Sequence, residues 1–436
     1  MKFYHNAGPT FPNALSFGIL RLCPAFSFLE NGNGMIGTVI SNASRSERMK
    51  LSERMGRLGT ETAFEILAKA KQLEAQGKDI IHLEIGEPDF DTPQNIIDAG
   101  ANALKSGYTH YGPSPGLNET RARIAQEIAT TRNIPVTGDN VVVTPGGKPI
   151  MFFSILALVD EGDEVLYPNP GFPIYESMIN FVGGVPVPMK LLGERDFAVD
   201  VEEVASQITP RTKMMIINSP NNPCGSIIEK DDLEALAKLA RENDLVVLSD
   251  EIYSRFLYEG EHHSITAFPG MLERTIILDG FSKTYAMTGW RAGYGVMPLE
   301  LVEPISRLST NSISCTAAFT QIAAIEALDG PQDEANRIVA EFKKRRDIIV
   351  NGLNAIEGIR CPMPKGAFYI FPDIKGTGMS SRDFADGLLN EAGVACLAGE
   401  AFGKYGDGCV RFSFANSAEN IEKALERIGD WLRSKN

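Results

Sequence analysis

The chain has 436 residues, of which 43% are hydrophobic and 22% charged, and its formal net charge is −14. This length allows more than one domain and a large core, and the composition is typical of a globular protein. The acidic balance argues against a nucleic-acid partner, which needs a basic face, and no apolar run reaches the roughly 18 residues of a membrane span.

Residues 1–56 differ from the rest of the chain. They contain no aspartate, carry a slight basic excess and show no helix or strand period. We predict a disordered extension, or sequence upstream of a later start at Met35 or Met49. A presequence is the alternative, although the stretch has neither a long apolar segment nor an Arg-rich amphipathic helix. The Gly-x-Gly-x-x-Gly string at 32–37 is not followed by a convincing helix, so it does not indicate a dinucleotide site.

A regular pattern begins after Thr60. Apolar side chains at helical spacing predict a helix from Thr62 to Gln76, and the stretch 79–85 is typical of a short buried strand. A turn-rich loop at 86–90 follows. Further along, a loop dense in Gly and Pro, which contains Tyr111, precedes a predicted helix at 118–132.

Two strand–turn–helix units come next. A β-branched strand at 141–144 ends in Pro145-Gly146-Gly147-Lys148, and a buried helix is predicted at 150–159. Such a turn aims backbone N–H groups and the positive end of a helix at a phosphate, although a Gly-Gly turn alone is a weak signal. A second strand, 163–167, ends in a Pro-rich loop that contains Phe172, and a further strand is predicted at 185–189.

Polar side chains follow the next three predicted strands. Asn222 lies in the loop after the strand 213–218, Asp250 follows the apolar run 245–249, and Lys283 comes after a third strand. Ligands bind beyond the carboxyl ends of the strands in an open α/β sheet, so we expect these side chains in one crevice. Taken alone, such polar residues are more typical of a turn, a helix cap or the surface.

Lys283 lies just past the strand 275–278 and is followed, eight residues on, by Arg291 at the start of the strand 291–297. A neighbouring guanidinium lowers the pKa of a lysine, which frees its amine for Schiff-base chemistry, and it can hold a phosphate bidentately. We therefore expect a cofactor with both a carbonyl and a phosphate group, with a structural lysine as the alternative.

The chain changes character after Pro304. Arg411 lies on an apolar strand, where an unpaired cation is costly to bury, so it needs an anionic partner. The predicted elements of this part are a long segment at 309–328, a helix at 334–355, a strand at 367–371, a helix at 382–391 capped by Ser381, a strand at 410–415 and a terminal helix at 419–433 capped by Ser417.

Metal binding is not indicated. His262 and His263 are adjacent, so their side chains point apart on an extended loop, and no third ligand is evident. The six cysteines are scattered without a Cys-x-x-Cys pair. This pattern is typical of free thiols in a reducing compartment, and we expect a cytoplasmic protein.

Two longer strings resemble the signatures of one enzyme family. The string from Ser282 to Arg291, Ser-Lys-Thr-Tyr-Ala-Met-Thr-Gly-Trp-Arg, resembles the cofactor-lysine signature of class I/II aminotransferases. These are pyridoxal-phosphate enzymes of the aspartate aminotransferase fold, fold type I. The string Ser-Pro-Asn-Asn-Pro at 219–223 is the second, followed by Cys224 where the family has threonine. The resemblance extends from about residue 60 to 430.

The resemblance implies an α/β fold with two domains and a homodimer. A large pyridoxal-phosphate domain, 91–325, would contain a mostly parallel seven-stranded sheet flanked by helices. A smaller α+β domain would be formed by 326–436 together with the N-terminal segment 57–90.

For the cofactor, pyridoxal 5′-phosphate, the resemblance implies contacts to the ring and to the phosphate. Lys283 would hold the cofactor as a Schiff base and carry the proton, and Asp250 would pair with the ring nitrogen. The remaining ring contacts are Phe172, which stacks on the ring, and Asn222 and Tyr253, which bond its oxygen. The phosphate contacts are Ser282, Arg291, Gly147, Lys148 and Tyr111 of the partner subunit, with Gly280 where many relatives have a further serine.

For the substrate, the resemblance implies that Arg411, Asn222 and the backbone of Gly86 hold an L-amino acid whose amino group passes to a 2-oxo acid. An aspartate-type enzyme is favoured, since a lysine at the position of Lys148 meets a second carboxylate in some relatives. Glu61, if it points inward, would repel that carboxylate. Alanine, aromatic or branched-chain donors remain open, and so does β-elimination. A DNA-binding regulator is disfavoured, because 1–56 show no helix-turn-helix pattern.

Overall fold

The structure, a computed structural model, describes residues 49–435. Our predictions for residues 1–48, including the glycine-rich string at 32–37, lie outside the described residues. Residues 49–52 are exposed and have no helix or strand. A 3-10 helix, Glu53–Arg57, follows, and Arg57 Nη2 donates to the carbonyl oxygen of Phe181 at 3.3 Å. The predicted extension to residue 56 therefore differs from the structure at its end, where a hydrogen-bonded turn already begins.

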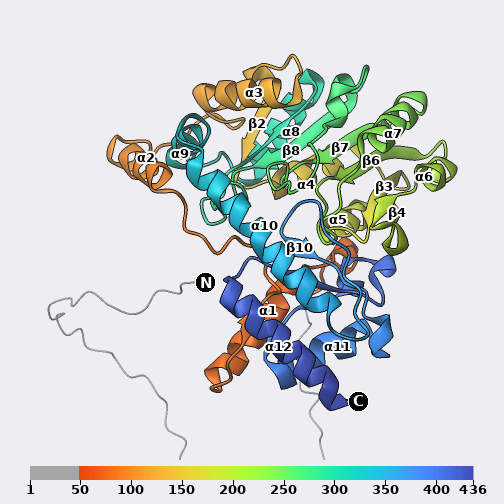
Figure 1. The fold of residues 1–436 in the computed structure, drawn as a ribbon. Coiled ribbons are helices and arrows are strands. Elements are labelled where there is room, and N and C mark those ends of the chain that lie inside the picture. The colour runs from red at the N-terminus through yellow and green to blue at the C-terminus, as the bar shows by residue number, and fades with distance from the viewer. Residues whose placement is uncertain (1–48, 436) are drawn as a thin grey trace, which may run out of the picture. The chain divides into compact units, whose positions relative to one another are not determined.

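The largest sheet has eight strands in the order β2-β9-β8-β7-β6-β3-β4-β5 (Figure 1). Strands β4, β3, β6, β7 and β8 are parallel, whereas β9 is antiparallel to both of its neighbours and β5 is antiparallel to β4. The bounds are β2 (Val141–Thr144), β3 (Glu164–Asn169), β4 (Val185–Leu192), β5 (Ala198–Val199), β6 (Thr212–Asn218), β7 (Val246–Asp250), β8 (Thr275–Gly280) and β9 (Gly293–Val296).

Our prediction of seven strands is one short, because β5 has only two residues and no strand period. The α/β class is confirmed. Alternate side chains of one strand lie in different core clusters: Val141 and Val143 pack in one, and Val142 packs in another. A sheet buried on both faces needs such continuous apolar strands, and helices cover both of its faces.

One face of the sheet packs against α4 (Lys148–Leu158), α5 (Ile174–Val182) and α8 (Leu299–Ser312). The other face packs against α2 (Gln94–Lys105), α3 (Asn118–Arg132), α9 (Ala318–Asp329), α6 (Val201–Gln207) and α7 (Lys230–Glu242). The predicted long segment at 309–328 is thus two helices. They are separated by a break in which Ser314 has the left-handed φ of 64°.

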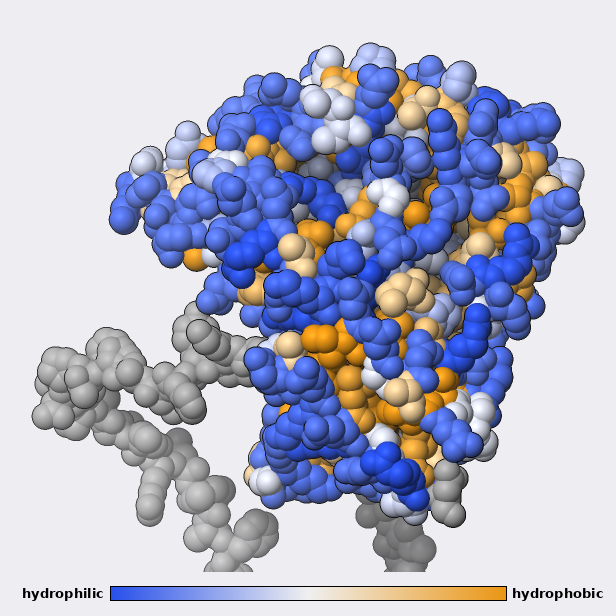
Figure 2. All heavy atoms as spheres, viewed as in Figure 1, coloured by the Kyte–Doolittle hydropathy of each residue, from blue (hydrophilic) through white to orange (hydrophobic). Residues whose placement is uncertain are grey.

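The C-terminal part packs around a core to which Tyr253 and Phe256 also contribute. Its three-stranded sheet has the order β10-β13-β12, and Figure 2 shows apolar side chains gathered across the lower half of the viewed face. The bounds here are α10 (Asp333–Asn354), β10 (Tyr369–Ile370), α11 (Ser381–Gly387), β11 (Val394–Ala395), β12 (Leu397–Ala398), β13 (Val410–Ser413) and α12 (Ala418–Lys435).

The N-terminal segment packs against this C-terminal core. Strand β1 (Ile81–His82) pairs in parallel with β11, and α1 (Thr62–Ala75) buries Ala70 against Leu389. Only two residues of the predicted strand 79–85 therefore pair in a sheet. The predicted domain bounds at 90 and 325 stay predictions.

Two helix caps could be compared with their predictions. Ser417 is a cap as predicted, since its Oγ accepts from the N–H of Asn420 at 3.2 Å. The prediction of Ser381 as a cap is wrong by one residue: Ser380 Oγ accepts from the N–H of Asp383 at 3.1 Å. Among residues 49–435, no helix has the length and hydropathy that a bilayer crossing requires.

Candidate active site

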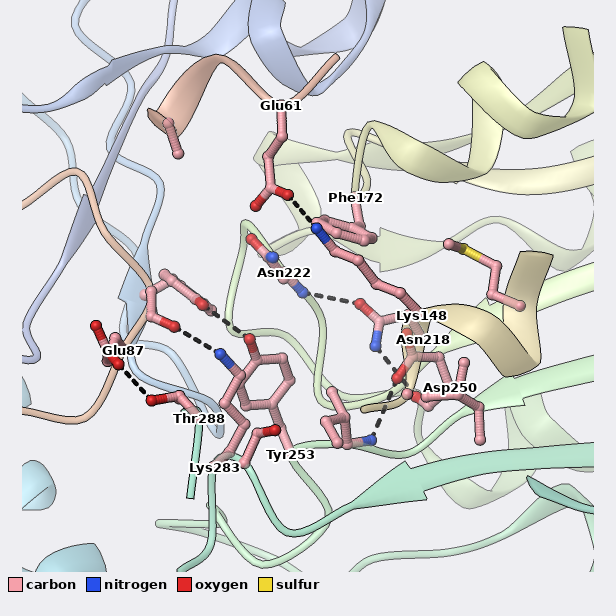
Figure 3. A pocket seen from close by; sticks show the side chains of 18 of the residues that line it. Glu61, Glu87, Lys148, Phe172, Asn218, Asn222, Asp250, Tyr253, Lys283 and Thr288 are labelled. Atoms are coloured by element: carbon pink, nitrogen blue, oxygen red, sulfur yellow. Dashed lines mark hydrogen bonds and ion pairs between the residues drawn. The ribbon is translucent and has the colours of Figure 1, made fainter. Parts of the chain in front are cut away.

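A cavity of about 480 Å³ opens beyond the carboxyl ends of the parallel strands. Figure 3 shows side chains from both sides of the cavity pointing into the same space. Every predicted site residue except Tyr111 lines this cavity. They are Gly86, Gly147, Lys148, Phe172, Asn222, Asp250, Tyr253, Ser282, Lys283, Arg291 and Arg411.

Lys283 projects from the loop after β8, and its Nζ donates to the carbonyl oxygen of Gly86 at 2.6 Å. Its ammonium lies 5.9 Å from the ring centre of Tyr253. Burial, with a smaller contribution from the positive charge of Arg411, lowers the pKa of Lys283 to about 8. We predicted that Arg291 would lower this pKa. The direction is right but the cause is wrong, because burial dominates and the contributing guanidinium is Arg411.

Asp250 is the last residue of β7 and is buried. Its Oδ2 accepts from the hydroxyl of Tyr175 at 2.6 Å, and its Oδ1 accepts from the N–H of Ile252 at 3.2 Å. Burial raises the pKa of Asp250 to about 6. Among the described residues it forms no ion pair, so this buried carboxylate lacks a counter-ion when it is charged. The sequence had not drawn attention to Tyr175.

Asparagine side chains connect Asp250 to Arg411. Asn218, at the end of β6, donates from Nδ2 to the backbone oxygen of Asp250 at 3.1 Å and accepts from the N–H of Asn222 at 2.9 Å. Asn222 Oδ1 in turn accepts from Arg411 Nη1 at 3.1 Å. Asn218 was missed by sequence reasoning, although it also ends an apolar strand.

Arg411 lies on β13 and is only 3% exposed. Its Nη2 donates to the backbone oxygen of Glu84, its Nε has no hydrogen-bond partner, and its guanidinium lies 4.6 Å from the ring centre of Tyr369. Burial lowers the pKa of Arg411. Within residues 49–435 it forms no ion pair. An anion that enters the cavity would stabilise this buried cation by pairing with it.

The N-terminus of α4 forms the opposite wall. Gly147 is the N-cap residue and supplies no side-chain cap, and it lines the cavity together with Lys148, the first residue of the helix. Arg291 is exposed, and its Nη1 and Nη2 donate to the backbone oxygens of Thr288 and Pro145 at 2.8 and 3.2 Å. Ser282 lies beside them and is buried. N–H groups, a hydroxyl and a guanidinium together suit a phosphate.

Tyr369 is a site residue that sequence reasoning missed. Its hydroxyl lies 2.7 Å from that of Tyr253, and both side chains are buried. A Cβ at position 86 would lie 1.9 Å from the hydroxyl of Tyr369, so only glycine fits there. The sequence did contain a signal for Tyr369, because a tyrosine on an apolar strand buries a hydroxyl that needs a hydrogen-bond partner.

Glu61 points inward. Its Oε2 forms a 2.5 Å ion pair with Lys148 Nζ, as Figure 3 shows, and that ammonium also lies 5.4 Å from the ring centre of Phe172. Tyr111 does not line the cavity of its own chain, and its side chain is 91% exposed. Its predicted reach into a partner subunit stays a prediction.

Comparison with known proteins agrees with this geometry. The family model "Aminotransferase class I and II" matches residues 78–428. An aspartate aminotransferase of Pyrococcus abyssi is 41% identical over 85% of this chain and 96% of its own length. An aspartate/prephenate aminotransferase of Thermus thermophilus is also 41% identical, over 87% of this chain and 97% of its own length.

A solved structure, Thermus thermophilus aspartate aminotransferase with maleate, has a TM-score of 0.85 and 39% sequence identity, and the match covers 88% of this chain and 100% of that one. The resemblance inferred from the two signature strings is thereby confirmed. The chain belongs to the class I and II aminotransferase family, and it is a transaminase.

Proposed function

We propose that the protein transfers the amino group of an L-amino acid to a 2-oxo acid with pyridoxal 5′-phosphate held on Lys283. The observation that carries the proposal is the lysine amine itself. It faces the cavity, its pKa is lowered to about 8, and it lies among groups that suit both halves of such a cofactor. When bound, pyridoxal phosphate supplies an electron sink for the electrons of a broken Cα–H bond.

The residues present fit this cofactor. The uncapped N-terminus of α4, Arg291 and Ser282 would hold the phosphate, and Tyr111 of the partner subunit would add a further hydroxyl. Asp250, which has no ion-pair partner among the described residues, would pair with a protonated ring nitrogen. Phe172 would stack on the ring. Asn222 and Tyr253 would donate to its oxygen.

The chain's own groups would then handle the substrate. Arg411, whose Nε has no hydrogen-bond partner among the described residues, would bind the α-carboxylate through its guanidinium, close to the backbone of Gly86. This contact would orient the Cα–H bond. The freed amine of Lys283 would remove a proton at Cα and return one, a role that its lowered pKa suits at neutral pH. Tyr369 would keep Tyr253 in place through their shared hydrogen bond.

We further propose an aspartate-type amino donor and a cytoplasmic homodimer. The ammonium of Lys148 stands in the cavity, where it suits a second carboxylate, and the relatives named above include aspartate aminotransferases. Cys224, Cys361, Cys396 and Cys409 are buried free thiols, which suits a reducing compartment.

Covalent labelling tests the role of Lys283. After reduction of the cofactor-loaded protein with borohydride, peptide mapping should place the label on Lys283, and Lys283→Ala should lose turnover by orders of magnitude while still binding the cofactor noncovalently. The control is Lys213→Ala, which removes an exposed lysine from β6 and should retain turnover. Label on another lysine, or normal turnover of Lys283→Ala, would refute the assignment.

A further inference from the structure

The ion pair between Glu61 and Lys148 joins two distant parts of the chain inside the cavity. Glu61 is the N-cap residue of α1, and Lys148 is the first residue of α4, 87 positions later. Their side chains are 22% and 49% exposed, so the pair is partly withdrawn from water and remains within reach of a ligand. Both residues line the cavity that contains Lys283 and Arg411.

Two aromatic rings lie close to this ion pair. The ammonium of Lys148 lies 5.4 Å from the ring centre of Phe172 and 5.9 Å from that of Phe64, and Met151 lines the same cavity. A carboxylate in such a place interacts more strongly with its neighbours than one in water. The negative charge of Glu61 accordingly raises the pKa of both Lys283 and Arg411, against the lowering effect of burial.

Among residues 49–435, the carboxylate of Glu61 forms a hydrogen-bonded ion pair only with Lys148. Glu61 stands at the N-cap position of α1, yet its side chain makes no cap hydrogen bond to the helix. The carboxylate therefore interacts with a group of the cavity and does not cap the helix.

We propose that Glu61 is a specificity-determining residue: a tethered carboxylate that occupies Lys148 and so sets the choice between acidic and uncharged amino-acid side chains. This rests on the proposed transaminase function and deepens it. A substrate with a second carboxylate must displace Glu61 or share one ammonium with it, and two carboxylates at one site repel each other. A substrate with an uncharged side chain leaves the ion pair between Glu61 and Lys148 intact, and that side chain packs against Phe64 and Phe172. Both classes are then accepted, and Glu61 weakens the preference for the acidic one.

The first test compares two amino donors on the holoenzyme. Glu61→Gln should raise the ratio of kcat/KM for aspartate to that for phenylalanine by about tenfold, since one repulsive charge contact is removed. The missing cap bond at Glu61 means that this change leaves the helix intact. The matched control, Glu65→Gln, removes an exposed carboxylate from the same helix and outside the cavity, and should not change the ratio.

The second test measures binding without turnover. Calorimetric titration of the holoenzyme with succinate and with 3-phenylpropionate compares a dicarboxylate with an uncharged-tail monocarboxylate. Succinate should bind about tenfold more tightly to Glu61→Gln than to the wild-type protein, and 3-phenylpropionate should bind equally to both. Adding Lys148→Met should abolish the gain for succinate, because Glu61 acts through Lys148.

The outcomes separate this inference from the function on which it rests. If the ratio does not change in Glu61→Gln, or if the succinate gain survives Lys148→Met, the proposed role of Glu61 is overturned while the transaminase assignment stands. If the wild-type protein transfers no amino group from aspartate, phenylalanine, alanine or a branched-chain amino acid, the proposed function fails. In that case, equal succinate affinities of wild-type and Glu61→Gln proteins would overturn the role of Glu61 as well.

Discussion

At the scale of single residues, Asp250 is a carboxylate whose surroundings supply neutral donors, namely the hydroxyl of Tyr175 and the N–H of Ile252. Its folded-state pKa of about 6 lies above the ordinary value of 3.8. The folded chain therefore binds this proton more tightly than the unfolded chain does. The resulting stabilisation is present below pH 3.8 and is lost as the pH rises through 6.

Replacement of Asp250 should therefore stabilise the cofactor-free protein at the expense of function. At pH 8, we expect the free energy of unfolding of Asp250→Asn to be about 2–3 kcal/mol higher than that of the wild-type protein, since a buried charge is removed. At pH 5 the difference should be smaller. Thermal unfolding at both pH values measures it, with the exposed Asp407→Asn as the control.

Asp250→Asn should also lose turnover and cofactor affinity, because no carboxylate would remain to face the ring nitrogen. A stability difference that is the same at pH 5 and pH 8 would contradict the assigned pKa. Unchanged turnover would contradict the assigned role.

At the scale of elements, the cavity wall at the N-terminus of α4 depends on how closely β9 approaches the turn that precedes α4. A Cβ on Gly293, the first residue of β9, would lie 2.4 Å from the carbonyl carbon of Gly146 and from the nitrogen of Gly147. Gly146 itself has a φ of 89°, which favours glycine. The N–H groups that we assign to a phosphate are therefore held in place by backbone packing against backbone.

Gly293→Ala tests this packing. We expect it to push the turn away from β9, to cost about 1–3 kcal/mol of stability through overpacking, and to weaken pyridoxal-phosphate binding at least tenfold. Spectroscopic titration of the cofactor-free protein and thermal unfolding measure the two effects. Gly289→Ala is the control, because a Cβ there meets nothing within 4 Å. Equal cofactor affinity in both variants would show that the turn does not need this contact.

The elements that sequence predicts best are those buried on both sides. Strand β2 and most of β6 are such buried runs. The helix α3 also coincides with its prediction, although it buries only one face. Short elements were missed: β5 has two residues, and its pairing with β4 depends on long-range contacts rather than on a local pattern. The break between α8 and α9 was also missed, because it depends on a left-handed serine, Ser314, that no local residue choice signals.

At the scale of the whole molecule, strand ends explain why part of the site was predictable. Asn222, Asp250 and Lys283 follow adjacent parallel strands, and such ends meet at one edge of a sheet. Tyr175 and Tyr369 were not predictable in this way, because they reach the cavity from a helix and from the C-terminal sheet. The inward direction of Glu61 was left open, since a helix start can face either way.

The proposed homodimer gives Tyr111 a function that a single chain cannot show. Tyr111→Phe should weaken pyridoxal-phosphate binding about tenfold, since one hydrogen bond to a charged group is lost. Tyr108→Phe, on the same loop, is the control. Equilibrium titration of each variant measures the affinity.

Hybrid dimers give a sharper test of this arrangement. Mixed Tyr111→Phe and Lys283→Ala subunits should regain one intact site per hybrid dimer, because each site would take its lysine and its tyrosine from different subunits. The measurement is cofactor affinity: the site of the hybrid dimer that retains Lys283 should bind pyridoxal phosphate as tightly as the wild-type site does. A hybrid whose affinity stays at that of the Tyr111→Phe protein would place Tyr111 outside the partner's site.

The cavity wall has two origins along the chain. The cavity-lining groups that one chain would contribute to its own cofactor lie between positions 147 and 291, whereas Glu61, Gly86, Tyr369 and Arg411 come from the N-terminal segment and the C-terminal sheet. Apart from changes at Lys148 and Asn222, substitutions that retune which amino acids are accepted can therefore accumulate in the N-terminal and C-terminal segments, while the vitamin's anchorage in the part between them is inherited unchanged.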